Sequence, residues 1–164
     1  MKTLYLIGGT MGVGKTTVCQ KIKQKISNSV FLDGDWCWDA HPFQVTEETK
    51  AMVMRNICFL LNQFLHCSAY DHIIFCWVMH EQGIIDTILT NIDKTNCRIK
   101  TISLICDSDT LRNRLEKDIA KGIRTEDIID RSMKRLPLYD VLNTVKIRTD
   151  NMSIDHVADS IIAL

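Results

Sequence analysis

An excess of charge of either sign is missing from this 164-residue chain, which carries 20 lysines and arginines against 20 aspartates and glutamates. A protein without a net field does not attract nucleic acid or an anionic lipid surface by charge alone. We therefore expect no nucleic-acid partner and no membrane partner. Any site for an anion must be built locally.

Long hydrophobic runs are absent as well. The longest uninterrupted apolar stretch covers residues 73–79, far short of the roughly 20 residues that span a bilayer. The first residues lack the basic, apolar and small-residue succession of a signal peptide. The seven cysteines are an odd number and contain no C-x-x-C pair. These features predict a cytoplasmic protein with reduced, mostly buried thiols.

Prolines are scarce, and the two that occur, Pro42 and Pro137, fall between predicted elements. Apolar segments alternate with amphipathic ones along the whole chain, which is typical of β-α units around a mainly parallel sheet. We predict one α/β domain over residues 1–164, with a five-stranded sheet between two layers of helices. Thr125 and Ser153 are the expected N-caps of the last two helices. The expected strands cover 3–7, 29–33, 72–77, 99–106 and 144–148, and the expected helices cover 15–27, 46–66, 81–93, 108–121, 125–136 and 153–163.

A glycine-rich phosphate-binding pattern follows the first predicted strand. Residues 9–16 read G-T-M-G-V-G-K-T and match G-x-x-x-x-G-K-[ST], in which lysine reaches the β- and γ-phosphates and the hydroxyl ligates Mg²⁺. The helix that follows adds the favourable field of its N-terminus. The alternative is a turn that merely joins strand to helix. The pattern predicts ATP and Mg²⁺ as cofactors, bound through Gly9, Thr10, Met11, Gly12, Val13, Gly14, Lys15, Thr16 and Thr17.

Two carboxylates follow the second predicted strand, at the sheet edge that also carries the phosphate loop. Asp33 and Asp35 are separated by a glycine, which turns the chain so that they need not face the same ligand. A kinase needs one acid near the hydrated Mg²⁺ and another to orient the attacking hydroxyl. The alternative is an Asp-Gly turn whose carboxylates bind only backbone amides.

The third predicted strand lacks the acidic residue that orients Mg²⁺ in many phosphate-loop ATPases, because the chain continues Trp77-Val78-Met79-His80. This absence disfavours motor and switch NTPases and makes Asp33 the better metal-side carboxylate. Trp77 and His80 then fall on the expected substrate side, and Trp36 and Trp38 lie near the end of the second predicted strand. The three tryptophans predict an apolar or aromatic acceptor pocket on that substrate side. Core packing of the large aromatic side chains is the alternative.

Charged residues are dense between positions 111 and 124, and Gly122 offers a hinge there. An arginine-bearing lid over bound ATP would neutralise the transferring phosphoryl group and exclude water. Arg124 is the candidate lid arginine, and a solvated helix face with ion pairs is the alternative. Arg135, four residues before Tyr139, is a candidate for binding a polar or anionic group of the acceptor.

With these positions assembled, the chain resembles the phosphate-loop kinases of small metabolites, in particular shikimate kinase and gluconate kinase, over nearly its whole length. The similarity lies in the loop at 9–16, the F-L-D-G-D segment at 31–35, the R-L-P-L-Y segment at 135–139 and the closing stretch from residue 147. The resemblance implies a three-layer α/β/α P-loop NTPase fold with a small lid over about residues 116–131.

The resemblance also implies roles for single residues. Asp33 would assist Mg²⁺ together with Thr16, and Asp35 would contact the substrate hydroxyl. Arg135 would bind substrate. By position, Arg114 would lie against adenine and Arg124 would be the lid arginine.

Two departures separate this chain from shikimate kinase. That family has a run of glycines after the third strand, where this chain has Cys76-Trp77-Val78, which would obstruct the seat of shikimate. Its upstream arginine motif has only Arg55 as a loose counterpart. The resemblance therefore implies the fold, ATP, Mg²⁺ and the reaction type without the acceptor.

We predict an ATP-dependent kinase that transfers the γ-phosphoryl group to a hydroxyl of a small-molecule acceptor, as a monomer or a homodimer. Its predicted catalytic residues are Lys15, Asp35 and Arg124. One alternative is a nucleoside monophosphate kinase, which would need acceptor-side arginines for a second phosphate. The other is an ATP-binding regulatory or antibiotic-resistance protein without efficient transfer.

Overall fold

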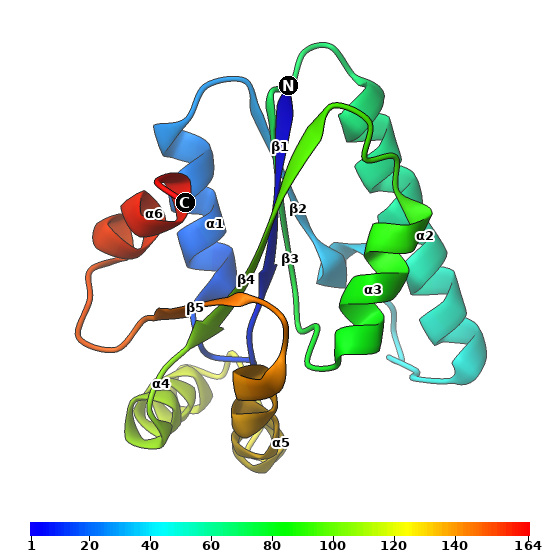
Figure 1. Ribbon diagram of the computed structural model, residues 1–164. Helices are drawn as coiled ribbons and strands as arrows, with labels where there is room; N and C mark the ends of the chain where they lie inside the picture. Colours follow the sequence, from blue (N-terminus) through cyan, green and yellow to red (C-terminus); the bar gives the residue numbers. More distant parts are fainter.

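A five-stranded, fully parallel sheet forms the centre of the molecule (Figure 1), in a computed structural model that describes residues 1–164. The strand order is β2-β3-β1-β4-β5, so the N-terminal strand lies in the middle. All five strands lie where the sequence predicts them, and the predicted three-layer α/β fold is confirmed. The strands are β1 Lys2–Gly8, β2 Ser29–Asp33, β3 His72–Trp77, β4 Cys97–Ile105 and β5 Val145–Arg148.

Helices cover both faces of the sheet. In Figure 1, α1 (Lys15–Lys25) and α6 (Ile154–Ile162) lie on one side, and α2 (Glu47–His66) and α3 (Gln82–Asn91) lie on the other. Two further helices, α4 (Ser108–Ala120) and α5 (Asp127–Arg135), lie at the edge where the strands end. Short 3₁₀ helices follow β2 and α5, as η1 (Gly34–Cys37) and η2 (Leu136–Val141).

The core is divided by the sheet into two clusters of 18 and 16 buried residues. Alternate side chains of β1 point to opposite faces, as the two-residue period of a strand requires. Tyr5 and Ile7 pack with α1 and α6, whereas Leu4 and Leu6 pack with α2 and α3. Both faces of β1 are therefore buried, which explains why its sequence is a continuous apolar run.

Of the two N-caps predicted from the sequence, one is confirmed and one is wrong. Ser153 caps α6 as predicted, because its side chain accepts a hydrogen bond from the His156 N–H. The prediction that Thr125 caps α5 is wrong. Its hydroxyl bonds to the Asp127 carboxylate instead, and the helix begins after Glu126 without a side-chain cap. A carboxylate is a strong acceptor for a hydroxyl, and the Thr125 side chain turns toward Asp127 rather than toward the helix amides.

None of the helices combines the length and the apolar composition that crossing a bilayer would require.

Candidate functional site

The loop between β1 and α1 is shaped by glycines. Gly14 precedes α1 with a φ of 104° and Gly12 has a φ of 84°, backbone conformations that cost a residue with a Cβ free energy. A Cβ on Gly12 would lie 2.6 Å from Leu115 Cδ2 of α4. The loop therefore packs closely against α4.

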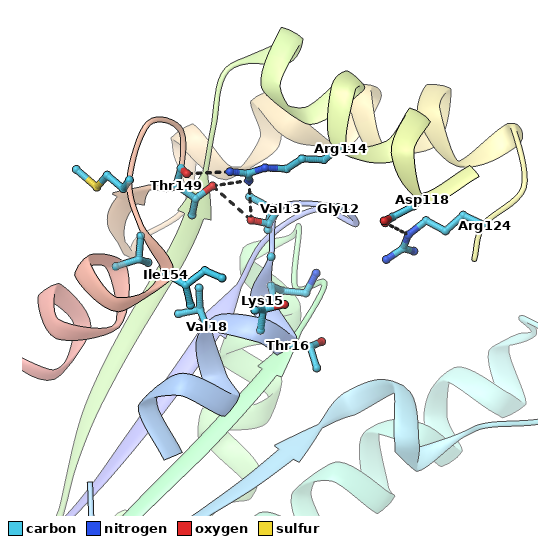
Figure 2. Close-up of a pocket in the computed structure, with 14 residues that line it drawn as sticks. Gly12, Val13, Lys15, Thr16, Val18, Arg114, Asp118, Arg124, Thr149 and Ile154 are labelled. Atoms are coloured by element: carbon cyan, nitrogen blue, oxygen red, sulfur yellow. Dashed lines mark hydrogen bonds and ion pairs between the residues drawn. The ribbon is translucent and has the colours of Figure 1, made fainter. Parts of the chain in front are cut away.

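A cavity of about 380 Å³ opens over this loop (Figure 2). The loop and the start of α1 form one wall, Arg114, Asp118 and Arg124 a second, and residues from Thr149 onward a third. The structure thus brings both predicted arginines to the phosphate-loop cavity. The predicted nucleotide-binding residues that line it are Gly12, Val13, Gly14, Lys15, Thr16, Thr17 and Arg114.

The three residues at the start of the predicted loop do not line the cavity. Thr10 is fully buried, and its hydroxyl donates to the Ser132 carbonyl oxygen of α5 at 3.1 Å. Met11 packs against the core, and Gly9 donates its N–H to the Val78 carbonyl oxygen at 3.4 Å. These residues hold the loop between β3 and α5.

Lys15 lies across the loop that it follows. Its ammonium donates to the Thr10 carbonyl oxygen at 3.1 Å. Burial lowers the pKa of Lys15 below its ordinary value of 10.5, although the Asp35 and Asp33 carboxylates act in the opposite direction. A half-buried cation that lacks a full anionic partner is stabilised when an anion binds beside it.

Thr16 and Asp33 are the two residues of the site that could hold a metal ion. The Thr16 hydroxyl, exposed at the start of α1, donates to Asp33 Oδ2 at 2.8 Å. The chain has no cluster of three or more His, Cys, Asp or Glu side chains that could hold a metal ion by themselves. A hydroxyl and one carboxylate suit Mg²⁺, which keeps several waters and takes its other ligands from phosphates.

Arg114 ties the phosphate loop to the segment after β5. Its guanidinium donates to the Val13 carbonyl oxygen at 3.1 Å, to Thr149 Oγ1 at 2.9 Å and to the Thr149 carbonyl oxygen at 2.8 Å (Figure 2). The guanidinium edge is therefore occupied by protein. Arg114 is also one of the residues that line the cavity.

Arg124 is paired with an acid that the sequence did not single out. Its Nε donates to Asp118 Oδ2 at 3.1 Å, and both side chains line the cavity (Figure 2). The predicted lid consists of the last turns of α4, the turn at Gly122 and the start of α5. Asp118 lies in a charge-rich helix, where an acidic residue is usually solvent-exposed. The sequence pattern therefore did not indicate that Asp118 would pair with Arg124.

The second acid, Asp35, lies on the other side of the loop, where its carboxylate is exposed. Its backbone N–H donates to Asp33 Oδ1 at 3.1 Å, and its Oδ1 accepts from Trp77 Nε1 at 3.0 Å. Trp36 points largely into solvent, 57% exposed, with its ring edge-on to Phe31. The structure therefore brings Trp77 to Asp35, whereas Trp36 packs on β2 away from that hydrogen bond.

His80 and Arg135 are also close enough to influence each other. Burial lowers the pKa of His80, and the Arg135 guanidinium lowers it further. His80 Nδ1 is buried without a hydrogen-bond partner, while Nε2 lies 3.4 Å from Glu81. This pair places an imidazole and a guanidinium on the side of the sheet edge predicted for the acceptor.

Three solved structures share this fold over almost the whole chain. A gluconokinase from Sinorhizobium meliloti 1021 has a TM-score of 0.71 at 13% identity, covering 98% of this chain and 90% of its own. A tunicamycin resistance protein from Deinococcus radiodurans has a TM-score of 0.72 at 14% identity, and the match covers 99% of this chain and 95% of its own. A shikimate kinase from Acinetobacter baumannii, in complex with shikimate, has a TM-score of 0.61 at 19% identity, and the match covers 99% of this chain and 91% of its own.

Sequence comparison identifies the family. No curated protein sequence matches the chain. A family model described as an AAA domain matches residues 6–134. This range contains the phosphate loop, both acids after β2 and both cavity arginines. The chain therefore belongs to the AAA domain family, and it shares its fold with the gluconokinase and the shikimate kinase.

Proposed function

We propose that this protein is an ATP-dependent kinase that phosphorylates a hydroxyl group of a small molecule. The observation that carries the proposal is the hydrogen bond between Thr16 and Asp33 at the phosphate loop, with Asp35 two residues further on. It supports a metal side and an acceptor side that meet at one sheet edge, as phosphoryl transfer requires.

The residues present fit ATP and Mg²⁺. The glycine-lined cradle would hold the phosphates, and the half-buried Lys15 would gain an anionic partner. Thr16 and Asp33 would hold Mg²⁺, which supplies charge neutralisation at the phosphate oxygens. Arg114 would present its face to the base.

The proposed reaction breaks one bond and forms one. The acceptor oxygen attacks the γ-phosphorus, the bond from that phosphorus to the β,γ-bridging oxygen breaks, and ADP leaves. Asp35 orients the hydroxyl and accepts its proton. Arg124 would leave Asp118 and turn to the equatorial oxygens, where charge spreads in the transition state.

Two observations bear on the acceptor. The structural neighbours include a gluconokinase, a sugar kinase and a tunicamycin resistance protein, so polyols, sugars and antibiotics belong in a first screen. A nucleoside monophosphate acceptor is less well supported, because the stretch from 36 to 66 offers only Arg55 for a second phosphate.

The test is a coupled assay of ADP release with Mg²⁺ and ATP over sugars, polyols, nucleosides, nucleotides, and aminocyclitol and phenicol antibiotics. Acceptor-dependent ADP release that is lost in Lys15→Ala is the expected result. Tight ATP binding with no ADP formed for any acceptor would overturn the kinase and favour the ATP-binding regulatory or resistance protein. Thermal unfolding gives an independent check, since ATP should raise the Tm of the unaltered protein and not that of Lys15→Ala.

A further inference from the structure

We propose that Trp77 is a positioning residue that fixes the Asp35 carboxylate for its reaction with the acceptor hydroxyl. The inference rests on the proposed function, in which Asp35 receives the acceptor proton. It changes the role predicted from the sequence, which placed Trp77 against the acceptor itself. The observation is the hydrogen bond from Trp77 Nε1 to Asp35 Oδ1, 3.0 Å long, between residues 42 positions apart.

The sheet register sets up this contact. Asp33 of β2 pairs with Cys76 of β3, so Gly34 lies beside Trp77, the last residue of β3, which itself pairs with Gly8 of β1. A Cβ on Gly34 would lie 2.5 Å from Trp77 Cγ and 2.7 Å from Cδ1. The indole ring thus lies directly on the glycine that separates the two acids. Gly34 is required here because only a residue without a side chain leaves room for the ring.

A second aromatic ring supports the indole. Trp38 meets Trp77 edge-to-face, with ring centroids 6.0 Å apart and an interplanar angle of 75°. Trp38 is held in turn by Phe43 at 4.9 Å, and Asn56 of α2 donates to the Cys37 carbonyl oxygen at 3.0 Å. The ring that binds Asp35 is therefore confined by Gly34 and by Trp38, and it directs its N–H at a fixed point.

The chemistry of the two groups suits this role. An indole N–H only donates, so it holds one carboxylate oxygen without competing for the acceptor proton. Asp35 is exposed, and a free side chain there would sample several rotamers. With its backbone held by Asp33 and Oδ1 held by Trp77, Asp35 presents Oδ2 to the acceptor. Misplacement of a reacting group by about 1 Å can cost about a hundredfold in rate.

The hydrogen bond itself can be tested without an acceptor. The chain has three tryptophans, and their indole N–H resonances in a ¹H–¹⁵N spectrum can be assigned by elimination with Trp36→Phe and Trp38→Phe. Asp35→Ala should shift the Trp77 resonance and speed its exchange with water. The matched control Asp39→Ala removes another exposed acid of the same segment and should leave that resonance in place. An unmoved Trp77 resonance in Asp35→Ala would overturn the proposal.

The positioning role is tested by a double-mutant cycle, measured with the best acceptor or, where none reacts, with water as acceptor. Trp77→Phe should lower kcat by about tenfold to hundredfold, as expected for loss of a hydrogen bond to a charged group, with an unchanged KM for ATP. In an Asp35→Ala background the same substitution should have almost no further effect, because its partner is gone.

Trp36→Phe is the control for the cycle, since it removes an exposed indole that packs on Phe31 rather than on Trp77. Its effect should be equal in both backgrounds. Equal effects of Trp77→Phe in both backgrounds would instead assign Trp77 a packing or substrate-contact role and overturn the proposal. No turnover in the unaltered protein would overturn the proposed function and the positioning role together, while the Trp77 resonance would still report the hydrogen bond.

Discussion

Asp33 uses both carboxylate oxygens, and each oxygen serves a different part of the site. Oδ2 accepts from the Thr16 hydroxyl at 2.8 Å, and Oδ1 accepts from the Asp35 backbone N–H at 3.1 Å. The residue is buried, with 7% of its surface exposed. The alternative of a simple Asp-Gly turn therefore describes only one oxygen. The other faces the hydroxyl that follows the phosphate-loop lysine.

This division predicts different defects for the two acids. Asp33→Asn should weaken the response to Mg²⁺ and also lower the rate, since an amide is a poorer partner for a cation than a carboxylate. Asp35→Asn should keep nearly normal Mg·ATP affinity while turnover falls by roughly two to four orders of magnitude, the range for removing a positioned acid-base group. Separate titrations of Mg²⁺ and acceptor for each variant measure the two effects.

Each variant serves as the control for the other, because both exchange a carboxylate for an amide of the same size. Full activity in Asp35→Asn would reject its acceptor role. An unchanged Mg²⁺ response in Asp33→Asn would move the metal site elsewhere.

Arg114 should matter for folding as well as for nucleotide binding, because its guanidinium joins the phosphate loop to Thr149. Arg114→Ala removes the donor of the Thr149 carbonyl oxygen and leaves the Val13 carbonyl oxygen with only the Thr149 hydroxyl, at 3.3 Å. A charged hydrogen bond of this kind contributes about 2 kcal/mol, which corresponds to a loss of about 4–8 °C in Tm for a chain of this size. Arg112→Ala, an exposed arginine of the same helix, should change the Tm little. Equal Tm values for the two variants would contradict the anchoring role.

The fold was predictable because its signals are periodic and local. Every strand lies within two residues of its predicted bounds, and the helices end at most two residues from theirs. These elements follow from apolar runs, amphipathic periods and caps such as Ser153. The absence of a cap at Thr125 was not predictable, because it depends on the contact that the Thr125 hydroxyl makes with the Asp127 carboxylate.

The site was predictable where sequence fixes backbone shape and not where it depends on register. The pattern at residues 9–16 encodes a loop, so its position over the cavity followed directly. The contact of Trp77 with Asp35 depends on the pairing of Asp33 with Cys76, which no local pattern reveals. Thr149 was visible only as part of the stretch after the last strand, and Asp118 gave no signal at all.

The two tight glycines of the loop should respond differently to alanine. Both have positive φ, so each substitution costs about 1–2 kcal/mol of backbone strain. Gly14→Ala should cost only this, because no atom lies within 4 Å of the added Cβ. Gly12→Ala also drives the Cβ into Leu115 at 2.6 Å, which adds about 1–3 kcal/mol of overpacking. Denaturant unfolding of the two variants measures the difference.

The companion substitution Leu115→Ala separates strain from overlap. It should recover part of the loss in Gly12→Ala and nothing in Gly14→Ala, although it creates a cavity of its own. A Gly12→Ala variant as stable as Gly14→Ala would show that α4 yields to the loop without cost.

The lowered pKa of Lys15 predicts how the stability of the protein depends on pH. Between that lowered pKa and the ordinary value of 10.5, the folded protein binds fewer protons at Lys15 than the unfolded chain does. The free energy of unfolding should therefore rise with pH through this window, the sign expected when the unfolded state holds the extra proton.

Bound polyphosphate should reverse the shift, because an anion beside the ammonium raises the pKa of Lys15. Binding of Mg·ATP in the same window should then take up protons, and affinity should fall as pH rises through the lowered pKa. Calorimetric titration in buffers of different ionisation enthalpy measures this uptake directly. Lys15→Arg is the matched control, because a guanidinium keeps its charge throughout this window and should take up no proton. Proton uptake that persists in Lys15→Arg would assign the titration to another group and leave Lys15 without its role at the phosphates.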